Sequence, residues 1–173
     1  MLTLLTGRRG AGKTTTCLRL MRQARARGLH VTGLISPARF ADGRKVGIDL
    51  LDISSGEQRP LADLAQPQHL SGPRTLHWQF RPETMAWAQE ALRRAAPCDL
   101  LIVDELGPLE LEQQQGWRVA LEIIDRRDYR HALVVVRPEL LARARELWPQ
   151  ARILEIASPA ALDLEALSPG GWT

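Results

Sequence analysis

Short apolar runs alternate along the chain with longer segments in which apolar residues recur every three or four positions. The runs at 2–6, 30–35, 99–104, 132–136 and 152–156 predict strands that are buried on both faces. Residues 13–27 place Cys17, Leu20, Met21 and Ala24 at helical spacing, and helices are also predicted at 82–96, 114–127 and 138–148. Strands that alternate with helices predict an α/β fold with a mostly parallel sheet.

The alternation is interrupted between residues 36 and 61. Turn signals at Asp42 and Gly43 and at residues 54–56 flank a strand-like segment at 44–53, which predicts an antiparallel hairpin insertion at about 37–61. Asp49 and Asp52 in this hairpin are expected to face solvent. Residues 64–81 are rich in proline and polar residues and are expected to form a long loop, and a short helix is expected after residue 159.

Length and composition predict a globular protein with one domain, residues 1–173. The chain is 45% hydrophobic and 25% charged, which excludes disordered, collagen-like and coiled-coil chains. Cys17 and Cys98 lack the spacing of a disulfide framework or a zinc site, and both are expected to be buried. Because we find no signal peptide and no apolar stretch of membrane-spanning length, we expect a cytoplasmic protein that does not enter a membrane.

Arginine dominates the basic residues. The net charge is +3, and Lys13 and Lys45 are the only lysines among 23 basic residues. A mild positive charge permits binding to phosphate or nucleic acid but does not require it. The Arg-rich helix at 13–27 therefore leaves open a nucleotide-dependent module that binds nucleic acid.

Residues 7–14 satisfy the phosphate-loop pattern G-x-x-x-x-G-K-[ST]. The pattern follows a predicted strand and begins a predicted helix, where backbone N–H groups and the helix N-terminus can surround an anion. Lys13 is expected to reach the outer phosphates, and the Thr14 hydroxyl is expected to bind Mg²⁺. The expected nucleotide-binding residues in this loop are Gly7, Arg8, Arg9, Gly10, Ala11, Gly12, Lys13, Thr14 and Thr15.

The apolar strand at 99–104 ends in two acids and looks like a Walker B segment. Such a strand delivers carboxylates to the sheet edge at which α/β proteins bind ligands. Asp104 is expected to hold Mg²⁺ and Glu105 to polarise an attacking water, so Lys13 and Glu105 are the candidate catalytic residues. By analogy, the acidic pair favours the order 5-1-4-3-2 for the five parallel strands numbered along the chain.

Three blocks of the sequence resemble the THEP-type nucleoside-triphosphatases, small P-loop proteins called cancer-related NTPases in animals. The blocks are residues 7–15, residues 33–37 with the hairpin at 43–56, and residues 103–111, which are close to that family's I-D-E-I-G-x-M-E-L signature. The resemblance implies a three-layer P-loop NTPase fold of the RecA/ASCE-like type. It also implies Mg²⁺-dependent hydrolysis of several nucleoside triphosphates, such as ATP, GTP, CTP and UTP, to diphosphate and phosphate.

The sequence departs from the family after the fourth parallel strand, where Val136 and Arg137 replace the His-Arg pair of many relatives. A charge-stabilising arginine within the chain therefore stays open among Arg137, Arg8 and Arg9.

Two other interpretations remain. A small-molecule or nucleotide kinase would share the phosphate loop and could use Arg126, Arg127 and Arg130 as a lid. The nucleotide-dependent nucleic-acid module is the other. The tryptophans, including Trp78, are expected to anchor the core or a loop, although Trp78 or Phe80 in the long loop could approach a nucleobase.

Overall fold

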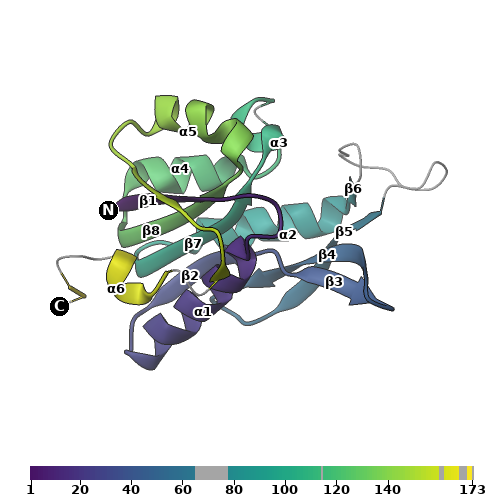
Figure 1. Cartoon of the computed structure of the whole chain (residues 1–173), viewed down its shortest axis with the longest axis horizontal. Helices are drawn as coiled ribbons and strands as arrows, with labels where there is room; N and C mark the ends of the chain where they lie inside the picture. The colour runs from purple at the N-terminus through teal and green to yellow at the C-terminus, as the bar shows by residue number, and fades with distance from the viewer. Residues whose placement is uncertain (65–77, 114, 160–161, 168–170, 173) are drawn as a thin grey trace.

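The computed structural model describes residues 1–64, 78–113, 115–159, 162–167 and 171–172. Most of the loop expected at 64–81 lies outside these ranges. The described strands form one nine-stranded sheet of order β6-β5-β4-β2-β7-β8-β1-β9, with β3 paired to β4 (Figure 1). The strands are β1 (Leu2–Thr6), β2 (Val31–Ile35), β3 (Ala38–Ala41), β4 (Arg44–Asp52), β5 (Gln58–Leu64), β6 (Trp78–Phe80), β7 (Cys98–Leu106), β8 (Tyr129–Val136) and β9 (Arg152–Glu155).

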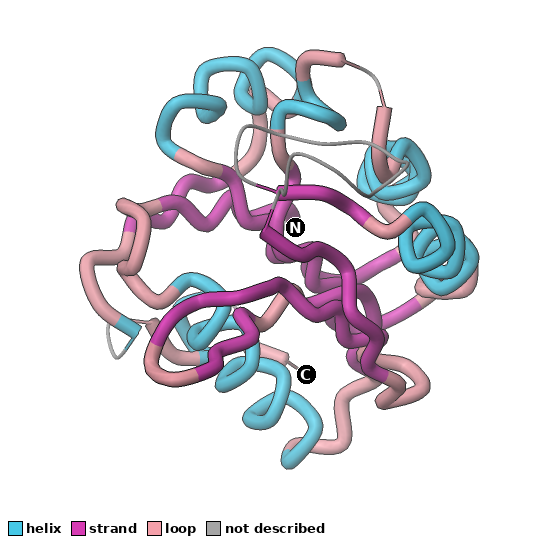
Figure 2. The backbone as a smooth tube through the Cα atoms, turned by 90° about the vertical axis from the view of Figure 1, so that its right-hand side faces the viewer, coloured by secondary structure: helices cyan, strands magenta, loops and turns pink. Residues whose placement is uncertain are grey.

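Helices cover both faces of the sheet and give the three layers that the sequence predicts (Figures 1 and 2). One face carries α1 (Lys13–Ala26) and α6 (Leu164–Leu167), and the other carries α2 (Pro82–Arg93), α4 (Arg118–Arg126) and α5 (Leu141–Leu147). Two short helical turns, α3 (Pro108–Leu111) and the 3₁₀ helix η1 (Pro138–Leu140), follow β7 and β8. No helix in the described ranges is long and apolar enough to cross a membrane.

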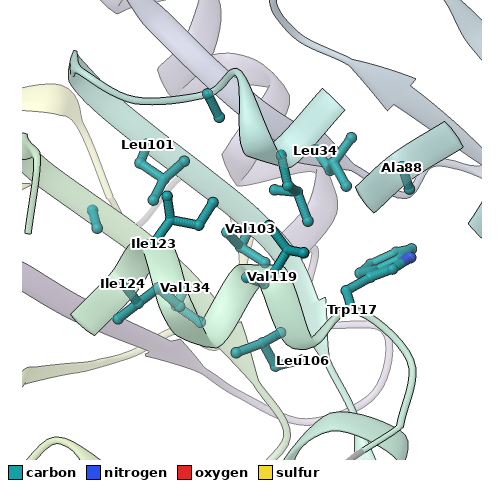
Figure 3. Packing of buried hydrophobic residues seen from close by; sticks show 14 of the residues in the cluster. Leu34, Ala88, Leu101, Val103, Leu106, Trp117, Val119, Ile123, Ile124 and Val134 are labelled. Carbon is teal, nitrogen blue, oxygen red and sulfur yellow. The ribbon is translucent and has the colours of Figure 1, made fainter. Parts of the chain in front are cut away.

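The central strands are mostly apolar because each faces two helical layers. In β7, Leu101 and Val103 join the core under α2 and α4, whereas Leu100 and Ile102 join the core under α1. Figure 3 shows the first of these cores, in which Leu101, Val103 and Val134 pack with Val119, Ile123 and Ile124 of α4. Successive side chains point to opposite faces of a strand, so one short run supplies both cores.

The parallel strands follow the predicted order. β9, β1, β8, β7 and β2 are the fifth, first, fourth, third and second parallel strands of the chain, and their pairings give 5-1-4-3-2. The hairpin insertion continues the same sheet, because β4 pairs antiparallel to β2 through Leu34 with Asp52 and Ile35 with Leu51. The insertion therefore starts at the carboxyl end of β2, beside the expected site.

Several local expectations are wrong. The helix expected at 114–127 begins only at Arg118, because Gly116 has a φ of 67°, outside the helical region, and Trp117 is the N-cap, its N–H donating to the Glu110 carboxylate at 3.0 Å. Residues 78–80 form strand β6, since β5 offers them a pairing edge that the local sequence does not reveal.

The two hairpin acids do not face solvent as expected. Asp52 is buried and accepts hydrogen bonds from the Ser54 N–H at 2.9 Å and the Ser55 hydroxyl at 2.8 Å, which close the turn after β4. Asp49 pairs with Arg39 of β3 at 2.8 Å. Both acids therefore stabilise the hairpin insertion through contacts within it.

Candidate functional site

Residues 7–14 connect the carboxyl end of β1 to the first turn of α1. Gly10 and Gly12 have φ values of 84° and 85°, in the left-handed region that only glycine enters at little cost. The Ala11 N–H donates to the Arg8 carbonyl at 3.0 Å, and the Thr16 N–H donates to the Gly12 carbonyl at 2.8 Å to begin the helix. The chain thus turns tightly before the positive end of α1, a geometry suited to an anion.

The Lys13 side chain folds back along this loop. Its Nζ donates to the carbonyl of Gly7 at 2.7 Å and to that of Arg8 at 3.2 Å. The ammonium is therefore positioned by the loop itself, where it can contact a phosphate that the loop amides surround.

Asp104 lies beside the loop, although 90 residues separate the two in the sequence. Asp104 is 2% exposed, its carboxylate accepts the Ser36 N–H at 3.3 Å, and it lies close enough to the Thr14 side chain for Thr14 to affect its pKa. Burial, and then the charge of Glu105, raise the pKa of Asp104 from 3.8 to about 7, while Thr14, Ser36 and Lys13 act in the opposite direction. The expected loop and carboxylate residues are thus neighbours.

The donor set around Thr14 fits a magnesium ion. A hydroxyl and a carboxylate are hard oxygen donors, and Mg²⁺ is commonly held by one or two such protein groups together with water and phosphate oxygens. Both groups lie at the phosphate loop.

Glu105 occupies a different environment from its neighbour. The Arg137 Nε donates to Glu105 Oε1 at 2.5 Å, and the Glu105 side chain is 26% exposed. Pairing between β7 and β8 shifts register between Val103 and Leu106, which coincides with the two acids. Sequence reasoning left a role for Arg137 open, and the structure places this arginine on the candidate catalytic carboxylate.

Two further residues reach the site without having been predicted. Ser36 follows β2, and its hydroxyl donates to the Asp104 carbonyl while its N–H donates to the Asp104 side chain. Its position after a strand that neighbours β7 is the sequence signal that could have identified it. Lys45 of β4 is half-buried, with its Nζ 4.7 Å from the centre of the Trp78 ring. Trp78 itself is buried in the core, as an anchoring role predicts, so its ring is not open to a nucleobase.

Other candidate residues lie at or away from this edge. Arg8, Arg9 and Thr15 are exposed, whereas Gly7 and Ala11 are buried. The arginines that a kinase could use as a lid lie at the opposite edge, because Arg130 is the second residue of β8 and its ion pair with Asp99 joins the starts of β8 and β7. Arg126 and Arg127 precede that strand. A phosphate-facing lid from these three residues is therefore wrong.

The arginines of α1 are largely engaged within the protein. Arg19 donates to the carbonyls of Pro159 and Leu162, Arg25 donates to that of Ile53, and Arg27 pairs with Glu165. These contacts leave fewer arginine N–H donors of α1 and its C-cap available to an external ligand.

The segment after β9 packs on the phosphate loop. A Cβ at Gly7 would collide with the Ile156 carbonyl, and one at Gly12 would lie 2.8 Å from Pro159 Cδ. The Ile156 N–H also donates to the Thr6 carbonyl at 2.9 Å. The loop is thus enclosed between α1 and this later segment.

Comparison with known proteins adds an independent finding. A family model described as NTPase matches residues 3–157. The chain is 36% identical over 110 residues to nucleoside-triphosphatase THEP1 of Methanopyrus kandleri, an alignment that covers 63% of this chain and 59% of that relative. It is 32% identical over 145 residues to nucleoside-triphosphatase THEP1 of Thermococcus kodakarensis, covering 83% of this chain and 79% of the relative.

Two solved structures share the fold. The solution structure of a human cancer-related nucleoside triphosphatase gives a TM-score of 0.67 at 20% identity and covers 88% of this chain and 87% of its own. The crystal structure of THEP1 from Aquifex aeolicus gives 0.65 at 19% identity and covers 90% of each chain.

Proposed function

Because this chain belongs to the NTPase family, as its resemblance to the THEP-type proteins predicted, we propose that it hydrolyses nucleoside triphosphates to diphosphate and phosphate. ATP, GTP, CTP and UTP are the proposed substrates, since the phosphate loop contacts the part that all four share. The buried free cysteines suit a reducing cytoplasm, which we propose as its location.

One observation carries the proposal: the buried Asp104 carboxylate, far from the phosphate loop in the sequence, lies beside that loop, where Thr14 and Lys13 both act to lower its pKa. A glycine turn alone could bind any anion. A buried carboxylate at the same point supplies the acidic group that a metal-bound polyphosphate needs.

In the proposed reaction, loop amides and Lys13 hold the β- and γ-phosphates while Glu105 orients a water in line with the γ-phosphorus. The bond from that phosphorus to the bridging oxygen breaks as the water oxygen bonds to the phosphorus, the proton that the water loses passes to the Glu105 carboxylate, and the diphosphate leaves with the bridging oxygen. The Arg137 contact engages Glu105 Oε1 and fixes the carboxylate near the loop. Thr14 and Asp104 are the proposed holders of Mg²⁺, which when bound offsets phosphate charge.

The test measures phosphate release from ATP, GTP, CTP and UTP with Mg²⁺ and with EDTA, without an acceptor substrate. We expect release from several triphosphates in Mg²⁺ only. Glu105→Gln keeps an oxygen that can accept from Arg137 but loses the carboxylate charge, so turnover falls by about 10²- to 10⁴-fold while nucleotide affinity is retained. Glu112→Gln, at an exposed position, is the matched control.

Two results would contradict the proposal. If the wild-type protein binds no triphosphate in magnesium buffer, the proposed hydrolase function is wrong. Unchanged phosphate release by Glu105→Gln removes Glu105 from its proposed role. Release that requires an acceptor would favour the kinase, and stimulation by RNA with a steep salt dependence would favour the nucleic-acid module.

A further inference from the structure

The hairpin insertion extends beyond the carboxyl edge of the parallel sheet. Its β4 strand pairs with the last residues of β2 through Leu51 and Asp52, and it runs antiparallel to β2. Lys45 stands six positions before Leu51, a distance of about 20 Å along a straight strand. Figure 1 shows β3 and β4 projecting on the right, beyond the junction of β1 and α1. The insertion therefore carries Lys45 to the side of the sheet on which the phosphate loop lies.

Lys45 sits among the charged groups of this site. Burial lowers the pKa of the Lys45 ammonium, as do the charges of Arg9 and Arg137, while Glu105 and Asp104 act to raise it. These four groups come from the phosphate loop, the end of β7 and the residue after β8. The Lys45 ammonium therefore lies within electrostatic range of the phosphate loop and of both acids.

The Lys45 ammonium is also not committed elsewhere. Its recorded contact within the described part of the chain is the face of the Trp78 ring, at 4.7 Å, and it forms no ion pair or hydrogen bond there. Cation–π contact leaves N–H donors available. By contrast, Arg39 of the same hairpin pairs with Asp49 and Asp63.

The cations at this edge outnumber the acids that can balance them. Arg9, Lys45 and Arg137 gather around Glu105, which already pairs with Arg137, and around Asp104, which is buried. Like charges that lower the pKa of a lysine are an unfavourable arrangement unless an anion joins them. A triphosphate bound by the loop would supply that anion.

Resting on the proposed hydrolase function, we propose that Lys45 is the hairpin's contribution to the site: its ammonium binds the terminal phosphate and neutralises the charge that develops there during hydrolysis. The Trp78 ring positions the Lys45 ammonium through its cation–π contact, and the hairpin thereby does within the chain what a partner's arginine does in other phosphate-loop enzymes.

The test compares Lys45→Met with Arg44→Met, a matched loss of charge at an exposed neighbouring position. Phosphate release from Mg²⁺-ATP gives kcat and KM, and calorimetry gives the affinity for ADP, which lacks the terminal phosphate. We expect Lys45→Met to lower kcat by about 10²-fold, as for loss of one transition-state donor. ADP affinity should stay within about twofold, because the contact is absent with the diphosphate. Lys45→Arg should retain more activity than Lys45→Met.

A kcat for Lys45→Met within about threefold of wild type, or an equal loss in Arg44→Met, overturns the proposal for Lys45. If Lys45→Met does not fold, Lys45→Gln replaces it under the same criteria. Failure of the hydrolase function itself has a different signature, since wild-type protein would then release no phosphate from ATP.

Discussion

Two glycines of the phosphate loop show how one residue type meets different demands. Gly10 and Gly12 have almost the same positive φ, but a Cβ at Gly10 would meet no atom within 4 Å, whereas one at Gly12 would meet the ring of Pro159. Backbone geometry therefore requires glycine at both positions, and packing requires it at Gly12 alone.

We expect Gly12→Ala to destabilise the protein more than Gly10→Ala does. Both variants meet the left-handed backbone cost of about 1–2 kcal/mol, and only Gly12→Ala adds the collision with Pro159. Thermal and urea unfolding of the two variants measure the difference, with Gly10→Ala as the matched control. Equal unfolding free energies would show that Pro159 moves aside freely.

At the scale of elements, Glu110 determines how the chain passes from β7 to α4. Its buried carboxylate accepts the Gly107 N–H at 2.9 Å and the Trp117 N–H at 3.0 Å, so one side chain joins both ends of the connection. Burial raises the pKa of Glu110, and the two N–H groups partly offset that effect. The connection that follows Glu105 is therefore held by a carboxylate that is costly to ionise.

This pKa shift predicts a pH dependence of stability. The folded-state pKa of Glu110 lies above its unfolded value, so the folded protein binds more protons between the two values. This contribution to the unfolding free energy is complete below the unfolded pKa and is lost as pH rises through the folded pKa. Urea unfolding of wild type and Glu110→Gln over this range isolates it.

The same variant has a second expected effect. Glu110→Gln places an amide N–H₂ against one of the two backbone donors, and an unsatisfied buried group costs about 1–3 kcal/mol. If the unfolding free energy of Glu110→Gln depends on pH as that of wild type does, Glu110 is not the origin of this dependence. If Glu110→Gln is as stable as wild type, other contacts hold the connection between β7 and α4.

The long elements were predictable because apolar spacing reports burial directly: β1 matches its expected bounds, and α1 differs by one residue at its end. The turn at α3 and strand β6 have four and three residues, too few to show a period. In the site, the loop and Asp104 were evident from motifs. Ser36 and Lys45 could not be identified from motifs. The pairing of β2 with β7 places Ser36 beside Asp104, and the course of the hairpin brings Lys45 toward the site.

At the scale of the whole molecule, the segment that follows β9 packs against the phosphate loop and α1, which are formed by the first part of the chain. The segment after β9 crosses the phosphate loop, and α6 packs on α1, where Arg19 donates to the Pro159 carbonyl at 2.8 Å and to that of Leu162. The first and last parts of the fold thus stabilise each other around the site.

We expect Arg19→Gln to weaken the packing of the segment after β9 and of α6 on α1. Loss of hydrogen bonds from a charged donor should lower the unfolding free energy by about 1.5–3 kcal/mol. Hydrogen exchange at Ile156 and α6 should become faster, whereas exchange in β7 should stay slow. Arg22→Gln, at an exposed position of the same helix, is the control. Unchanged exchange in α6 would show that apolar packing suffices there.

The described sheet has its free edges at its three shortest strands, which are β6 with three residues and β3 and β9 with four each. The outer backbone of a terminal strand can template the growth of a fibre by recruiting the backbone of another molecule. Edge strands this short offer few unpaired amide and carbonyl groups to a strand of another molecule. We therefore expect concentrated native protein to resist amyloid-like assembly through its sheet.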